Sequence, residues 1–76
     1  LSVAPTLHVI RKKLKDFSDN DYLVAIGDPT AIAIACMVGA EVNRGVVNML
    51  KWDKREKIYY PVTIDMLGRK EKEKNG

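Results

Sequence analysis

The side chains that most often carry catalysis are scarce in this chain of 76 residues, which holds one histidine and one cysteine. His8 falls on the basic side of a predicted surface helix, and Cys36 lies inside the most apolar stretch, where a thiol acts as a small hydrophobic residue. Asp28, Asp53 and Asp65 could meet at one sheet edge and hold a cation, but magnesium sites made only of protein carboxylates are rare. We therefore expect no enzymatic activity, no cofactor and no bound metal.

A turn at residues 27–30 is the strongest candidate for a small-ligand site. Its residues, Gly-Asp-Pro-Thr, lie between an apolar run and a helical stretch, and amides at the start of a helix attract anions. The turn lacks the glycine and lysine spacing of nucleotide-binding loops, and Asp28 would repel a phosphate. We predict a helix cap instead, with Asp28 as N-cap and Pro29 at the first helical position. A bound nucleotide here would be the enzymatic alternative.

Aromatic and basic side chains alternate between residues 51 and 60. Trp, Tyr and Arg dominate protein-binding hot spots, and a similar mixture binds single-stranded nucleic acids. Trp52 can also pair with Tyr59 or Tyr60 across a hairpin without any ligand. A protein partner is our first expectation for this segment, with four contact residues: Trp52, Arg55, Tyr59 and Tyr60.

Nucleic-acid binding is the second expectation, through basic residues on the first predicted helix and in the predicted hairpin turn. The net charge is +3, of which +2 falls in residues 69–76, so the body is nearly neutral. Proteins that coat nucleic acids spread positive charge over one face. The candidate contacts are Arg11, Lys12, Lys13 and Lys15 in the first group, and Lys54, Arg55 and Lys57 in the second.

Hydrophobic spacing predicts the elements that position these side chains. A stripe from Leu7 to Phe17 predicts a helix over residues 6–17, with Thr6 as N-cap. The apolar run at residues 22–26 predicts a strand buried on both faces. Residues 46–52 and 58–66 predict two further strands around a polar turn. Because Pro61 cannot donate to a ladder, the last strand should lie at a sheet edge.

A second helix is expected from residue 29 to about residue 43, with Asn43 or Gly45 as its left-handed terminator. Residues 31–40 carry no charge, so we expect this helix to be buried nearly all round. Small residues recur along it every four positions and would let another backbone approach closely. Either the first helix and the sheet cover it, or a second copy of the chain does. The small residues are Ala31, Ala35 and Gly39.

The order helix-strand-helix-strand-strand predicts a single small α/β domain over residues 1–68. Its sheet should be mixed and three-stranded, in the order one-two-three, with a parallel crossover and a C-terminal hairpin. Residues 69–76 have no apolar side chain and are predicted to be a disordered basic tail. So short a chain buries little surface, and association with a second chain would support it. The longest apolar run, of ten residues, is too short for a bilayer, which needs about 20, and no secretory signal is visible.

Five short features follow one another along the chain. They are Asp-Tyr-Leu at residues 21–23, Gly-Asp-Pro at 27–29, an alanine-rich helix, Leu-Lys-Trp-Asp-Lys at 50–54 and Tyr-Tyr-Pro-Val at 59–62. With these motifs the chain resembles a group of short proteins of tailed bacteriophages, including phages of marine and cyanobacterial hosts, over roughly residues 6–67. The resemblance implies a phage origin and the host cytoplasm, and no activity.

We accordingly expect a non-enzymatic accessory or host-modulating factor that binds a host or phage protein, with homodimerisation as a further possibility and no membrane contact. A nucleic-acid-binding accessory protein is the alternative. A minor structural component of the virion, lending an open strand edge to a neighbour, is the third.

Overall fold

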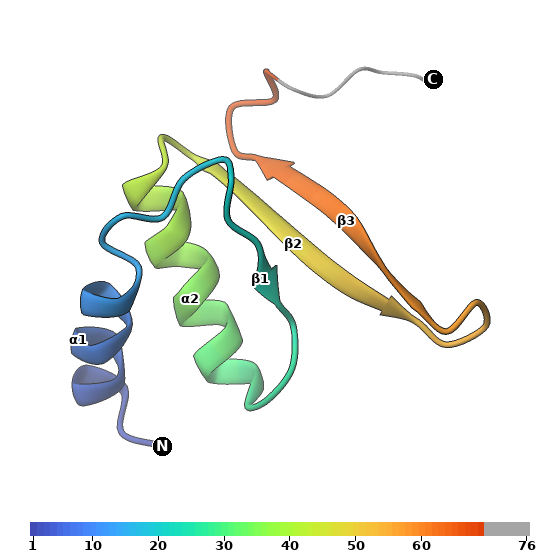
Figure 1. Cartoon of the computed structure of the whole chain (residues 1–76). Coiled ribbons are helices and arrows are strands. Elements are labelled where there is room, and N and C mark those ends of the chain that lie inside the picture. The colour runs from blue at the N-terminus through green and yellow to red at the C-terminus, as the bar shows by residue number, and fades with distance from the viewer. Residues whose placement is uncertain (70–76) are drawn as a thin grey trace.

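The computed structural model describes residues 1–69, and Figure 1 shows two helices beside a three-stranded sheet. In chain order the elements are α1 (Val3–Lys13), β1 (Leu23–Val24), α2 (Pro29–Val42), β2 (Val46–Asp53) and β3 (Ile58–Asp65). The predicted fold class and order of elements are confirmed. In the described part of the chain, no helix is long and apolar enough to span a bilayer.

The sheet has the predicted order β1-β2-β3, with β1 parallel and β3 antiparallel to β2. Pro61 lies on the edge strand β3, opposite Leu50. Just beyond the ladder, the Met66 amide donates to the Gly45 carbonyl at 2.8 Å, which sets the alternation of hydrogen-bonded and non-hydrogen-bonded pairs. Leu50–Pro61 is then a non-hydrogen-bonded pair, so the proline nitrogen faces the outer edge and the ladder loses no bond.

The first helix begins and ends earlier than the spacing predicted. Ser2, not Thr6, is the N-cap, and the Thr6 amide donates to the Ser2 carbonyl at 3.2 Å. Pro5 falls in the first turn, where amides have no intrahelical acceptor, so it does not delay the helix. Phe17 lies beyond the helix, in the loop to β1, and is only 7% exposed.

The expectation of a first strand buried on both faces is wrong. β1 has only two residues, and Tyr22, Val24 and Ile26 are all exposed. Figure 1 shows the reason, since α1 and α2 lie on the same side of the sheet and β1 is an edge strand. The side of this edge strand that faces away from the helices is therefore exposed to solvent, although its residues are apolar.

The second helix begins as predicted. Asp28 Oδ2 accepts a hydrogen bond from the Ala31 amide at 3.0 Å, and Pro29 is the first helical residue. Beyond its end, both Arg44 and Gly45 have positive φ, of 55° and 87°, whereas Asn43 has a φ of −110°. Of the two residues expected to be left-handed, Gly45 therefore is and Asn43 is not.

Replacing Asp28 with alanine should lower the free energy of unfolding by about 1 kcal/mol, because the Ala31 amide loses its acceptor. Urea denaturation followed by circular dichroism measures the change. Asp16→Ala, at an exposed carboxylate outside any cap, is the matched control and should change stability by less than about 0.5 kcal/mol. Equal effects for the two variants would contradict the capping role.

The second helix is not buried all round, contrary to expectation. Within it only Val38 and Gly39 are buried, and Met37 is 70% exposed. A Cβ atom added at Gly39 would lie 3.3 Å from Phe17 Cε2 and 3.5 Å from Val47 Cγ2. The Gly39 end of the small-residue stripe is therefore covered by the chain itself, not by a second copy. Ala31 and Ala35 are half-buried.

The core is small. Among the described residues the buried hydrophobic side chains are Phe17, Val38, Val46 and Val47. Asn43 is buried with them, and its Nδ2 donates to Asp19 Oδ1 at 2.8 Å and to the Val46 carbonyl at 3.0 Å. These two bonds tie the α1–β1 loop to the start of β2.

Arg69 marks the end of the described chain. Its guanidinium pairs with Asp65 at 3.1 Å and donates to the Arg44 carbonyl at 2.7 Å. The first residue of the predicted tail is thus attached to the domain, and residues 70–76 lie outside the described residues.

Candidate binding surface

One face of the sheet carries no helix. Strand residues alternate between the two faces, and α2 packs on the face of Val47 and Met49, with Cys36 Sγ 3.8 Å from Met49 Sδ. We call the opposite side the open face. The registers of the two ladders place seven residues on its uncovered part: Val24, Asn48, Leu50, Trp52, Tyr59, Pro61 and Thr63.

An aromatic pair lies at the outer end of the open face. Trp52 and Tyr59 are directly opposite in the ladder, and their ring centroids are 5.0 Å apart at an interplanar angle of 60°. The predicted cross-strand pairing is confirmed, with Tyr59 as the partner. Figure 1 shows that this end of the hairpin projects beyond the helices, and the two side chains remain 49% and 44% exposed.

The four predicted contact residues do not share one surface. Trp52 and Tyr59 lie on the open face and Arg55 lies in the turn, but Tyr60 is opposite Lys51 on the other face. Consecutive strand residues must point to opposite faces. The sequence pair Tyr59-Tyr60 therefore already contained the signal that separates them.

The hairpin turn is held by Asp53. Its Oδ1 accepts hydrogen bonds from the amides of Arg55 at 2.9 Å and Glu56 at 3.1 Å, and Lys57 adopts a positive φ of 58°. The backbone is thereby ordered while the basic side chains of the turn remain exposed.

The three aspartates considered for a cation do not come together. Asp28 caps α2, Asp53 holds the hairpin turn, and Asp65 pairs with Arg69 at the other end of the hairpin. Over residues 1–69 no group of three potential ligands is close enough to hold a metal ion. Each carboxylate is instead used to fix local structure.

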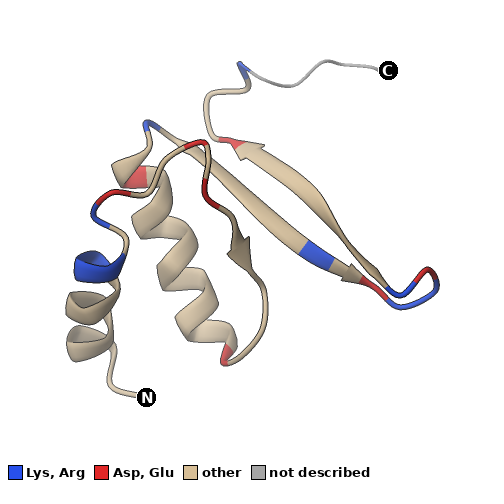
Figure 2. Ribbon diagram, viewed as in Figure 1, with Lys and Arg blue, Asp and Glu red and all other residues tan. Residues whose placement is uncertain are grey.

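The two basic groups proposed for nucleic-acid contact lie at opposite ends of the molecule. Figure 2 shows one at the end of α1 and the other in the hairpin turn. Arg11 pairs with Glu41 of α2 at 2.9 Å, and Lys15 pairs with Asp16 at 3.5 Å. Lys12 and Lys13 lie in the last turn of α1, where cations complement the helix dipole. The fold does not merge the two groups into one footprint.

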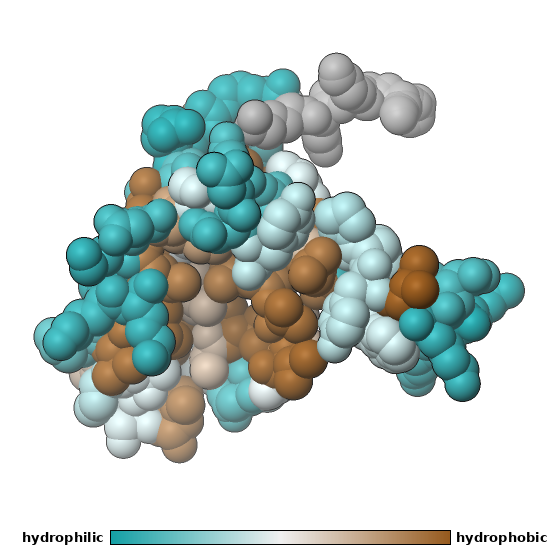
Figure 3. Space-filling model, viewed as in Figure 1, coloured by the Kyte–Doolittle hydropathy of each residue, from teal (hydrophilic) through white to brown (hydrophobic). Residues whose placement is uncertain are grey.

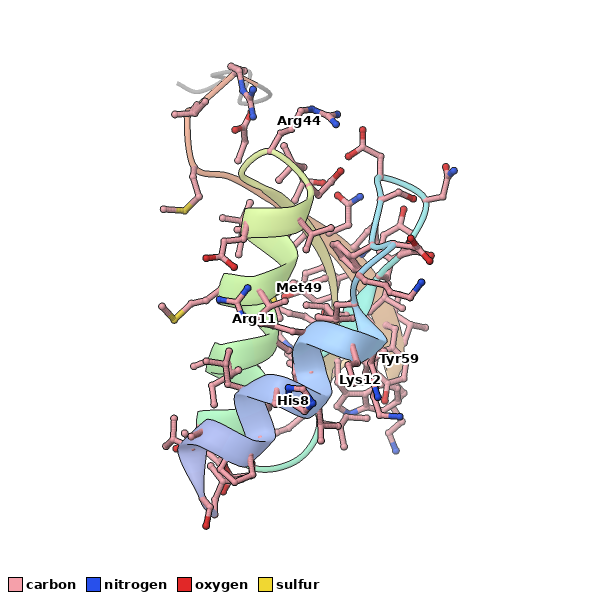
Figure 4. The ribbon with its side chains drawn as sticks, turned by 90° about the vertical axis from the view of Figure 1, so that its left-hand side faces the viewer. His8, Arg11, Lys12, Arg44, Met49 and Tyr59 are labelled. Atoms are coloured by element: carbon pink, nitrogen blue, oxygen red, sulfur yellow. The ribbon has the colours of Figure 1, made fainter. Side chains whose placement is uncertain are left out.

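The histidine and the cysteine face different surroundings. His8 is exposed on α1, where Figure 4 shows it on the side turned toward the viewer. Cys36 is half-buried against Met49, and burial raises the pKa of its thiol. A raised pKa lowers the thiolate fraction at neutral pH, which makes Cys36 a poor nucleophile.

Sequence reasoning missed a second apolar surface. A groove of about 460 Å³ lies between α2 and β3 and is lined by Met37, Ala40, Ile64, Met66 and others. It exists because α2 covers β2 but not the neighbouring part of β3. The uncharged stretch of α2 was the available signal. Figure 3 shows further exposed apolar side chains over β1 and the segment after it.

Comparison with known proteins gives the family. A family model described as Phage Pam3 gp32-like protein matches residues 1–66, which include all five elements. No curated protein and no solved structure matches the chain. The match confirms the phage origin that the motifs implied. The chain belongs to the Pam3 gp32-like family of phage proteins.

Proposed function

We propose that this phage protein works without catalysis, as an accessory or host-modulating factor that binds another protein in the cytoplasm of the infected cell. Its contact surface is the open face. The observation that carries the proposal is the edge-to-face pair of Trp52 and Tyr59, which stays about half exposed on a projecting hairpin. Large aromatic side chains that a partner can bury are the usual anchors of protein interfaces.

The surroundings of the pair support a protein ligand. Leu50 and Pro61 continue the same face inward, so the aromatic rings adjoin apolar side chains rather than charges. Together they give the uncharged centre and the polar surround of a protein-binding patch. Outside its turn the hairpin carries two charged residues, Lys51 on the other face and Asp65 at the inner end of the open face, where it pairs with Arg69.

Neither alternative is favoured by a specific observation. Nucleic-acid binding would need the separated basic groups to act together. A virion role through strand addition would need a free edge, but Pro61 removes a donor from the middle of the outer edge of β3, and β1 offers only two residues.

The double variant Trp52→Ala, Tyr59→Ala should lose protein binding, because single hot-spot truncations cost 2 kcal/mol or more, which is roughly a 30-fold change in affinity. The measurement is a pull-down with tagged protein from lysate of phage-infected cells, with and without nuclease, followed by mass spectrometry. Circular dichroism checks that the variant folds.

Ile58→Ala is the matched control, since Ile58 is 53% exposed on the same hairpin but belongs to the other face. It should leave capture unchanged. Undiminished capture by the double variant would contradict the proposal. Loss of all captured protein after nuclease treatment would assign the function to nucleic acid.

A further inference from the structure

We propose that the protein seated on the open face is a second copy of this chain, with the two sheets packed face to face about a two-fold axis near the Leu50–Pro61 pair. This inference rests on the proposed function, because it names the partner of the same surface. It was not the dimer that the sequence suggested, since the Gly39 end of that stripe is covered within the chain.

The side chains on the uncovered part of the open face are uncharged and mostly apolar, as in sheets that pack against a second sheet. From the hairpin turn inward it presents the aromatic pair, then the row Val24–Leu50–Pro61, then Asn48 and Thr63. None of these side chains is charged, and Thr63 Oγ1 donates to Asn48 Oδ1 at 2.7 Å, which satisfies one polar pair within the face. Sheets with such faces pack about 10 Å apart.

Charge at the two ends of the face identifies the second copy as the occupant. At the inner end lies the α1–β1 loop with Asp19 and Asp21, and the Asp19 carbonyl accepts a hydrogen bond from Asn48 Nδ2 at 2.9 Å. At the outer end lies the turn, where the cations Lys54, Arg55 and Lys57 outnumber the anions Asp53 and Glu56. Figure 2 shows more blue than red in the turn and more red than blue along the loop. Asp65 and Arg69, also at the inner end, neutralise each other.

A two-fold axis across the strands reverses the direction of one sheet over the other. The basic turn of each copy then lies above the acidic loop of its partner, and the uncharged rows meet at the axis. Within the same loop Lys15 is exposed and pairs with Asp16 at 3.5 Å, and Arg44, at the α2–β2 turn, is a further exposed cation near the acidic end. The arrangement is isologous, so it closes as a dimer and does not propagate.

Packing through faces is also favoured over packing through edges. The outward nitrogen of Pro61 interrupts the free edge of β3, and β1 is too short to pair with a full strand. The core of each copy is small, with four buried hydrophobic side chains among the described residues. Covering the open face would add a second apolar layer between the two sheets, which a chain of 76 residues cannot supply alone.

The test is the mass in solution, by size-exclusion chromatography with light scattering and by sedimentation over a range of concentrations. We expect the wild type to be a dimer whose dissociation constant rises with salt. Tyr59→Glu should weaken the dimer at least about 100-fold, because the carboxylate would be buried without a partner. Lys54→Glu with Arg55→Glu should also weaken it, since like charges would then face each other.

Ile64→Glu is the matched control. Ile64 lies on the same strand with nearly equal exposure, 41% against 44% for Tyr59, but on the other face. It should leave the dimer intact. Dissociation by Ile64→Glu but not by Tyr59→Glu would overturn the inference and place the contact in the α2–β3 groove. A dissociation constant insensitive to salt and to the charge reversals would overturn the two-fold alignment.

The failure of this inference can be told apart from failure of the proposed function. If the wild type stays monomeric at all concentrations but captures another protein through Trp52 and Tyr59, only the inference that a second copy occupies the open face is overturned. A monomeric wild type that captures other proteins equally well without Trp52 and Tyr59 overturns both the inferred dimer and the proposed function.

Discussion

Replacing Phe17 with alanine should lower the free energy of unfolding by about 3–5 kcal/mol, the range for removing a buried phenylalanine. Phe17 is 7% exposed, and its ring lies against Gly39, where an added Cβ atom would be only 3.3 Å from Cε2. A domain of this length has a total stability of about 4–11 kcal/mol. The variant should therefore lose at least about a quarter of the total stability and unfold at a clearly lower urea concentration.

Urea denaturation followed by circular dichroism measures the loss, at a fixed protein concentration so that any association contributes equally. Tyr22→Ala is the matched control, because Tyr22 is an aromatic residue of the same loop but is 48% exposed. Its stability should change by less than about 1 kcal/mol. A Phe17 variant no less stable than this control would mean that the loop does not seal the core.

Phe17 also shows what the sequence could not predict. Its spacing from Leu14 fits a helical stripe, so the first helix was expected to reach it, but α1 ends at Lys13 and the ring enters the core from a loop. No glycine or proline follows Lys13 to mark the end. Hydrophobic spacing identifies which side chains are buried together, but it does not distinguish a helical turn from a loop that brings the same residue to the same place.

The parts that were predicted well depend on residues with one dominant backbone role. Asp28 and Pro29 fixed the start of α2, and Pro61 placed β3 at an edge. The short apolar run at β1 has no such residue. Its sequence shows that it is apolar, but whether one or both faces are covered depends on where the helices pack.

The candidate surface was predicted in part. The aromatic pair across the hairpin was expected from the two strand patterns, because directly opposite residues interact in any antiparallel ladder. The separation of the basic groups was not visible, because residues 11–15 and 54–57 are far apart in the chain and only the packing of α1 sets their distance. The open face itself follows from both helices lying on one side of the sheet.

Replacing Asn43 should have the second-largest effect on stability, a loss of about 2–3 kcal/mol. Its amide is buried and donates both to Asp19 Oδ1 and to the Val46 carbonyl. Without it, the buried Val46 carbonyl loses a donor, which costs more than the bond itself contributes, and the exposed Asp19 carboxylate loses a hydrogen bond that water can replace. Asn43→Leu keeps the number and branching of side-chain heavy atoms and leaves no cavity, so the loss does not come from an unfilled space.

Asn20→Ala, in the same loop but exposed, is the matched control and should change stability by less than about 0.5 kcal/mol. Amide hydrogen exchange gives a second readout of the Asn43 variant. Exchange should accelerate in the α1–β1 loop and in β1, which Asn43 ties to β2, more than in the β2–β3 hairpin, whose ladder is independent of it. Uniform acceleration would contradict a local tether. A selective effect would mean that Asn43 also positions the acidic end of the open face, because Asp19 is the residue that it holds.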